Sequence, residues 1–79
     1  MPNALIVDGY RFHFYSNENN EPPHIHVASN GNEAKFWLNP VAFVRNRGFN
    51  ARELRAIERM VLANQETLES KWYEYFPIR

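Results

Sequence analysis

The sequence contains no cysteine, so no disulfide can stabilise the fold and nothing points to an oxidising compartment. It has no hydrophobic run long enough to cross a bilayer, and residues 1–20 lack an apolar segment of signal-peptide length. Its 9 basic side chains equal its 9 acidic ones in number, which argues against a strongly basic nucleic-acid-binding protein. We therefore expect a cytoplasmic protein with no membrane partner.

The chain is instead rich in aromatic side chains, with six Phe, four Tyr and two Trp among 79 residues. This length fits one domain, residues 1–79, close to the lower size limit for a hydrophobic core that is stable without help. A heavy aromatic load in so short a chain is typical of a small packed sheet. Because disulfides are excluded, association with another chain would add stability.

Two β-hairpins are predicted in the N-terminal half. The dipeptides Asp8-Gly9 and Asn30-Gly31 each separate two apolar or aromatic runs, and such pairs favour a two-residue turn with positive φ at both positions. The predicted strands are Ala4–Val7, Tyr10–Ser16, His24–Ser29 and Asn32–Leu38. The polar segment 17–23, which ends in two prolines, is predicted to be a loop. In this register the apolar residues face one another: Leu5 with Phe12, Val7 with Tyr10, Ile25 with Phe36 and Val27 with Ala34.

The C-terminal half is predicted to be helical. Asn39-Pro40 is typical of a helix start, so residues 41–47 are expected to form a short helix that ends at Gly48. Asn50 followed by Glu53 predicts the start of a second helix, along which an apolar stripe continues to Tyr75. The predicted fold is α+β. It has a small antiparallel sheet of two hairpins, about four strands, packed on a long C-terminal helix with a short helix before it.

The predicted long helix is longer than the sheet that it covers. A helix over residues 51–74 would measure about 36 Å, whereas a six-residue strand spans about 20 Å. The helix end, with Leu68, Trp72, Tyr75 and Phe76, then needs a cover: the 41–47 helix, a second copy of the chain, or another protein. A contiguous exposed apolar patch usually marks an interface. We therefore expect a homodimer or a complex with another protein, with Leu68, Trp72 and Phe76 near the contact.

The basic residues are concentrated in residues 45–59, which carry Arg45, Arg47, Arg52, Arg55 and Arg59 against Glu53 and Glu58. One interpretation is a solvated helix face, and the other is a patch in which Arg45, Arg47 and Arg52 bind a phosphate or an acidic partner. Two helices joined at a glycine also resemble a helix-turn-helix. Since the second helix carries the core stripe, it is poorly placed to enter a DNA groove.

All three histidines are predicted to share the sheet face that turns away from the helix. Strand alternation places eight side chains there, and no predicted element covers them, so we expect this face to be open to water. The residues are Arg11, His13, Tyr15, His24, His26, Glu33, Lys35 and Trp37.

Several interpretations of this face are open. RNA binding would use Tyr15 and Trp37 to stack on bases, and Arg11 and Lys35 to contact phosphates. Acid–base catalysis would use His24 and His26, with His13 on the substrate side. His24 and His26 could also bind a metal, but they have neither a cysteine nor a clear third ligand beside them, so we expect no tight zinc site and no cofactor. The plainest interpretation is a half-hydrated sheet with ordinary polar residues.

The string Pro22-Pro23-His24-Ile25-His26-Val27 is unusual, and the sequence resembles a family of small bacterial proteins known as domain of unknown function family 4160. The resemblance covers nearly the whole chain, on Tyr10–Ser16, Glu21–Val27, Glu33–Leu38, Asn46–Phe49 and the helix end near Trp72. It implies compact standalone proteins that are often encoded beside another small gene, an arrangement similar to toxin–antitoxin pairs. It implies no catalytic residues.

Two hypotheses follow from the residues and the resemblance together. The first is a component of a bacterial toxin–antitoxin-like module that binds or cleaves RNA through the polar sheet face; in the cleaving form, a ribonuclease-type toxin, His24 and His26 would be the catalytic pair. The alternative is a non-enzymatic interaction module. It would bind a neighbour-encoded protein through the long C-terminal helix and the arginine patch.

Overall fold

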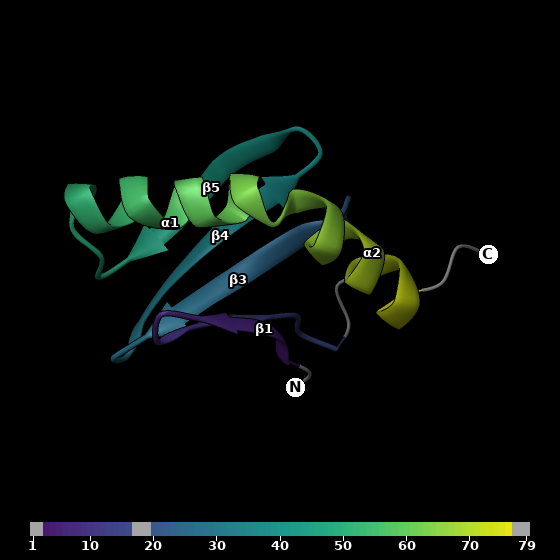
Figure 1. The fold of residues 1–79 in the computed structure, drawn as a ribbon, viewed down its shortest axis with the longest axis horizontal. Coiled ribbons are helices and arrows are strands. Elements are labelled where there is room, and N and C mark those ends of the chain that lie inside the picture. Colours follow the sequence, from purple (N-terminus) through teal and green to yellow (C-terminus); the bar gives the residue numbers. More distant parts are fainter. Residues whose placement is uncertain (1–2, 17–19, 77–79) are drawn as a thin grey trace.

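Five strands form one antiparallel sheet in sequence order, β1-β2-β3-β4-β5, in the computed structural model, which describes residues 3–16 and 20–76 (Figure 1). Two consecutive helices lie across one face of this sheet. The fold is therefore α+β, as predicted. The elements are β1 Asn3–Val7, β2 Tyr10–His13, β3 His24–Ser29, β4 Asn32–Leu38, β5 Val41–Arg47, α1 Ala51–Ala63 and α2 Gln65–Tyr75.

Both predicted hairpins and their registers are confirmed. Asp8-Gly9 and Asn30-Gly31 have positive φ at all four positions, which is the geometry that a two-residue hairpin turn requires. Leu5 lies opposite Phe12, and Val27 lies opposite Ala34. Of the loop predicted between the hairpins, residues 17–19 lie outside the described part of the chain.

The prediction of a short helix at residues 41–47 is wrong. This segment is β5, which pairs with β4 and forms an edge of the sheet. Asn39-Pro40, taken from the sequence as a helix start, forms the turn between the two strands, and its peptide bond is cis. Val41, Phe43 and Val44 are β-branched or aromatic residues, which favour a strand once a neighbouring strand is there to pair with them.

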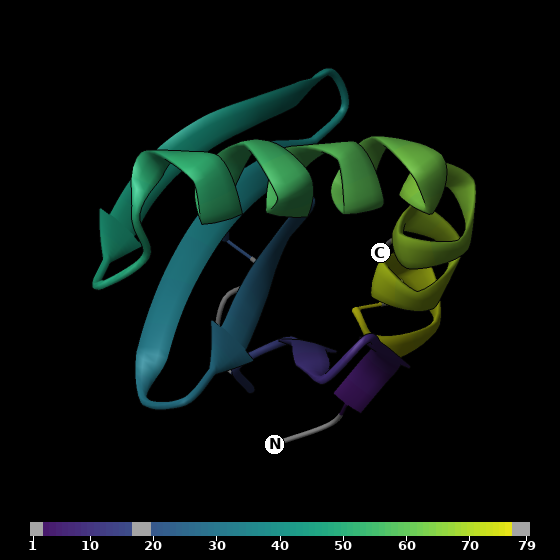
Figure 2. The same cartoon turned by 60° about the vertical axis from the view of Figure 1, so that its left-hand side comes forward.

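The long C-terminal helix is broken into two. Asn50 caps α1 as predicted, with its side chain accepting a hydrogen bond from the backbone N–H of Glu53 at 2.8 Å. At Asn64 the backbone leaves the helical conformation, and the Asn64 side chain donates to the carbonyl of Met60 at 2.8 Å. Asparagine side chains compete for backbone hydrogen bonds in this way and favour helix ends. After the break, α2 turns down beside the end of the sheet (Figure 2).

The break removes the predicted overhang. Leu68, Trp72 and Phe76 are buried in the core together with residues of β2, β3, β4 and α1. The expectation that they form an exposed apolar helix end is therefore wrong. The core itself lies between the helices and the sheet face that carries Phe12, Ile25, Val27, Phe36 and Leu38.

The two described helices have 13 and 11 residues. Within residues 3–16 and 20–76, neither helix has the length and apolar character that a membrane span requires.

Candidate functional site

The polar face of the sheet is organised in two rows of side chains that cross four strands. In the first row, Arg11 of β2 pairs with Ala28, Ala28 with Glu33, and Glu33 with Arg47 of β5. In the second row, His13 pairs with His26, His26 with Lys35, and Lys35 with Arg45. Residues directly opposite one another in an antiparallel sheet share a face. The two arginines of β5 therefore join the histidines and Lys35 on one surface.

A β-bulge puts the two arginines on this face. Lys35 pairs with Arg45 while the adjacent Phe36 pairs with Phe43, so Val44 is an extra residue on β5. Because side chains alternate with a period of two, one extra residue exchanges the faces of everything after it. Without the bulge, Arg45 and Arg47 would point to the helix side. Both arginines were predicted in a helical patch, so their position on this face was not predicted from the sequence.

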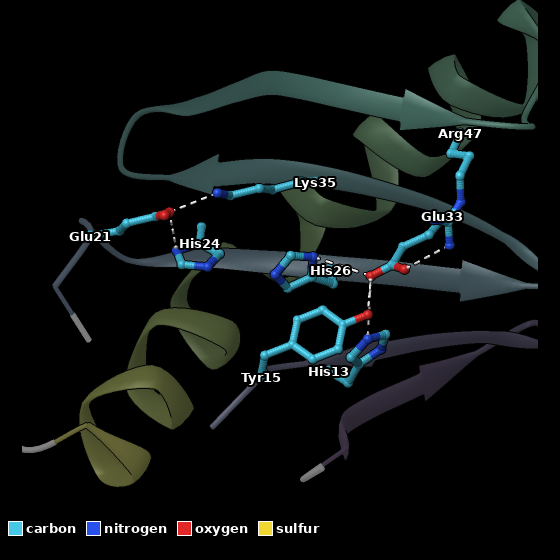
Figure 3. Close-up of polar contacts among 8 residues, drawn as sticks. All are labelled: His13, Tyr15, Glu21, His24, His26, Glu33, Lys35 and Arg47. Carbon is cyan, nitrogen blue, oxygen red and sulfur yellow. Dashed lines mark hydrogen bonds and ion pairs between the residues drawn. The ribbon is translucent and has the colours of Figure 1, made fainter. Parts of the chain in front are cut away.

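The histidines share one face as predicted, but this face is not open to water at their positions. His13, His24 and His26 are 2%, 0% and 1% exposed, and Lys35 is also buried. The ring of Tyr15 lies 4.5 Å from that of His26 and 5.1 Å from that of His13, between centroids. Residues just after β2 and just before β3 thus fold over the face (Figure 3). The expectation of solvent-exposed histidines is therefore wrong: Tyr15, which lies outside the regular elements, covers His13 and His26, and α2 covers His24.

His24 lies at the end of β3 that is nearest to α2. Its ring contacts Trp72 of α2 at 4.9 Å and Trp37 of β4 at 5.8 Å, between centroids, and its Nδ1 lies 2.9 Å from the carbonyl oxygen of Pro22. His24 is thus buried against a helix although the register of β3 is the predicted one. Its surroundings are those of a packed residue, which argues against the predicted catalytic role.

Glu33 is the centre of the polar contacts on this face (Figure 3). Its Oε2 accepts a hydrogen bond from the Tyr15 hydroxyl at 2.6 Å and lies 3.3 Å from Nδ1 of His26 and 3.6 Å from Nε2 of His13. Its Oε1 lies 3.5 Å from a guanidinium nitrogen of Arg47. The strand register predicted Glu33 on this face, but no role in binding or catalysis was predicted for it.

A second carboxylate contacts the other end of the same face. Glu21 accepts a hydrogen bond from Nζ of Lys35 at 2.6 Å, and the same oxygen lies 3.7 Å from Nδ1 of His24. Lys35 also lies 5.0 Å from the centre of the Trp37 ring, a cation–π distance. In the part of the chain that the structure describes, no three His, Cys, Asp or Glu side chains are arranged to hold a metal ion.

A pocket of about 560 Å³ opens between Tyr15 and β5, which we call the β4–β5 pocket. This volume is typical of a ligand site. Three of its side chains are cationic and one is a carboxylate. Its lining residues are Tyr15, His26, Glu33, Ala34, Lys35, Arg45, Asn46 and Arg47.

The charges of the β4–β5 pocket are only partly neutralised within the protein. Lys35 is paired with Glu21, and Arg47 lies near Glu33. Arg45 is exposed, and among residues 3–16 and 20–76 no carboxylate forms an ion pair with it. The pocket therefore presents net positive charge to a ligand, which favours an anion.

The predicted site residues are not all brought together. Tyr15, His26, Lys35, Arg45 and Arg47 line or border the β4–β5 pocket, whereas Arg52 is exposed on α1, at the other face of the sheet. The predicted arginine patch is thus divided between two surfaces. Arg11 lies in an adjacent hollow, and Trp37 is half-buried beside Lys35.

Comparison with known proteins gives one match. The sequence profile of a protein family described as "Domain of unknown function (DUF4160)" matches residues 9–73, a segment that runs from the first hairpin turn into α2. No curated protein and no solved structure matches the chain.

Proposed function

We propose that this protein, which belongs to the family described as Domain of unknown function (DUF4160), binds single-stranded RNA in the β4–β5 pocket as part of a toxin–antitoxin-like module. One observation carries the proposal: the bulge at Val44 directs Arg45 and Arg47 into a pocket that already contains Lys35. Arginine is well suited to phosphate because its planar guanidinium can donate two parallel hydrogen bonds.

The uncharged and acidic groups of the pocket favour RNA over DNA. Glu33 and His26 line the same pocket as the arginines and can exchange hydrogen bonds with a hydroxyl group. A carboxylate repels phosphate but accepts a hydrogen bond from a ribose 2′-hydroxyl, which is the group that distinguishes RNA from DNA at a given position. Tyr15 and Trp37 add aromatic area beside the cations, and both are only partly buried.

Burial of the histidines favours binding over cleavage. His24 does not line the pocket, so the predicted acid–base pair of His24 and His26 is not presented to a ligand there. His26 does line it, with Nδ1 beside the Glu33 carboxylate, and a base at that place could accept the proton of a 2′-hydroxyl. Cleavage is therefore an additional outcome of the binding experiment and is not required by the proposal.

The alternative function, an interaction module that uses the helix end and the arginine patch, receives less support from the geometry. The apolar residues assigned to its contact surface lie in the core, and the arginines are divided between β5 and α1. A partner protein is still compatible with RNA binding. In a toxin–antitoxin-like pair, a neighbour-encoded protein that covers the β4–β5 pocket would block access of RNA.

The test is a titration of end-labelled single-stranded RNA, followed by fluorescence anisotropy, with the wild type, Arg45→Gln and Arg55→Gln. Arg55 is exposed on α1 and is the matched control, since its substitution changes the net charge equally. Loss of one charge-assisted phosphate contact predicts an affinity about tenfold lower for Arg45→Gln. Arg55→Gln is expected to bind within about twofold of the wild type, because a distant charge is screened by salt.

Three further measurements complete the design. DNA of the same sequence is expected to bind more weakly than RNA, and gel analysis after the titration reports any cleavage. Expression of the wild type in bacteria is expected to slow growth more than expression of Arg45→Gln. Absence of RNA binding, or an equal loss in the two arginine variants, would show that the pocket is not the RNA site.

A further inference from the structure

A second hollow lies directly beside the β4–β5 pocket, between the turns of the two N-terminal hairpins. Its volume is about 390 Å³, and we call it the hairpin hollow. Arg11 and Arg47 line it at opposite ends of one row of the sheet, with Ala28 and Glu33 between them. Two turn glycines, Gly9 and Gly31, also line it. An ideal Cβ built on either glycine would meet no atom within 4 Å, so the turns leave open space there.

The two cavities share a wall made of Glu33 and Arg47. They correspond to the two rows of the sheet, the hairpin hollow to the row of Arg11 and Glu33 and the β4–β5 pocket to the row of His26 and Lys35. Arg11 of β2 and Arg45 of β5 lie in neighbouring rows, about 7 Å apart along the strands, and three strand spacings apart across the sheet, about 14 Å. Arg47 shares β5 with Arg45 and the row with Arg11, so an extended nucleic-acid strand that crosses the shared wall can place one phosphate near each of the two outer arginines.

The charges of the hairpin hollow also favour an anion. Arg11 is exposed, and within the described residues no carboxylate forms an ion pair with it. Glu33, the one acidic residue in the lining, already contacts Arg47 and the Tyr15 hydroxyl. Ser29, Asn30 and Asn32 add polar side chains that can donate hydrogen bonds to phosphate oxygens.

We infer that the hairpin hollow is a second phosphate subsite, and that the ligand is an RNA chain with at least two phosphates, one bound by Arg45 and one by Arg11, on either side of Arg47. This inference rests on the proposed function and extends it from the class of ligand to its minimum length. A mononucleotide occupies the β4–β5 pocket alone, whereas an oligonucleotide continues over Arg47 to Arg11.

The test compares the wild type, Arg11→Gln, Arg45→Gln and the control Arg55→Gln with two ligands, uridine monophosphate and an octanucleotide of uridine. For the octanucleotide, Arg11→Gln is expected to lower the affinity about tenfold. It is also expected to reduce the slope of log K against log salt concentration by about 0.7, the value for one phosphate contact on a single strand. For the monophosphate, only Arg45→Gln is expected to weaken binding. Arg11→Lys keeps the charge and is expected to retain most of the salt slope.

The outcomes separate this inference from the proposed function. If the octanucleotide binds, Arg45→Gln weakens it, and Arg11→Gln behaves like Arg55→Gln, the second subsite is refuted while the pocket remains the RNA site. If Arg11→Gln weakens the monophosphate as much as the octanucleotide, the two subsites are not separate, and the inference fails. If neither the monophosphate nor the octanucleotide binds, the second subsite and the proposed function are both refuted. Thermal melts of the five proteins, expected to agree within a few degrees, exclude unfolding as the cause.

Discussion

Replacement of Trp72 by alanine separates a core role for this residue from a role at an interface. Trp72 is 3% exposed, and its ring packs against Phe14, Phe76 and His24 at 5.6, 4.2 and 4.9 Å between centroids. Truncation of a buried Trp to Ala costs about 3–5 kcal/mol. A chain of 79 residues has a total unfolding free energy of about 4–12 kcal/mol, at 0.05–0.15 kcal/mol per residue. The substitution therefore removes a quarter or more of the stability.

The assay is urea unfolding followed by far-ultraviolet circular dichroism, with Tyr73→Ala as the matched control. Tyr73 is the next residue of α2 but is 42% exposed, so its truncation is expected to cost less than about 1 kcal/mol. Sedimentation of Trp72→Ala under native conditions is expected to match that of the wild type. The reasoning would be refuted if Trp72→Ala were no less stable than Tyr73→Ala and changed only the association state.

Three further predictions concern the turn glycines, the cap of α1 and a hydrogen bond between β2 and α1. Gly48 has φ +105° and an added Cβ would collide with the side chain of Asn32, whereas Gly31 has φ +81° with open space around it. Gly48→Ala is therefore expected to lose more stability in urea unfolding than Gly31→Ala, by about 1 kcal/mol or more, and an equal loss would contradict this. Asn50→Ala removes the cap of α1 and is expected to cost about 1 kcal/mol, with no loss of RNA affinity. The Tyr10 hydroxyl donates a hydrogen bond to the Glu53 carboxylate at 3.0 Å, and this bond raises the pKa of Tyr10 above its ordinary value of 10.0. The resulting stabilisation is present below pH 10.0 and is lost as the pH rises through the raised pKa, so the difference in unfolding free energy between the wild type and Tyr10→Phe should narrow there. A difference that does not change with pH would show that the hydrogen bond is not its cause.

The hairpins could be predicted because their determinants are local. Asp8-Gly9 and Asn30-Gly31 fix the turn, and the turn fixes which residues face one another, so the faces of four strands followed from two dipeptides. The grouping of His13, His24 and His26 on one face came from the same reasoning.

The strand β5 could not be found in this way because its identity depends on pairing. Asn39-Pro40 is compatible with a helix start as well as with a turn, and the bulge at Val44 interrupts the alternation that would have indicated a strand. The error then carried Arg45 and Arg47 away from the site to which β5 brings them.

Burial of the polar face depends on side chains that lie outside the regular elements. Tyr15 and Glu21 belong to the ends of the connection between β2 and β3, and their contacts with Glu33 and Lys35 are made across the sheet. Likewise, the apolar stripe continues through Asn64 into α2, so the sequence pattern gives no sign that the helix turns there. Tertiary packing decides both features.

RNA binding in the β4–β5 pocket is tested by mapping the binding site in solution. Backbone amide signals of isotope-labelled protein are followed by nuclear magnetic resonance while an octanucleotide of uridine is added. Binding in the pocket is expected to give the largest shifts at residues 33–35 and 45–47, which line it, and small shifts along α1. Shifts concentrated on α1, or no shifts at RNA concentrations well above that of the protein, would contradict it.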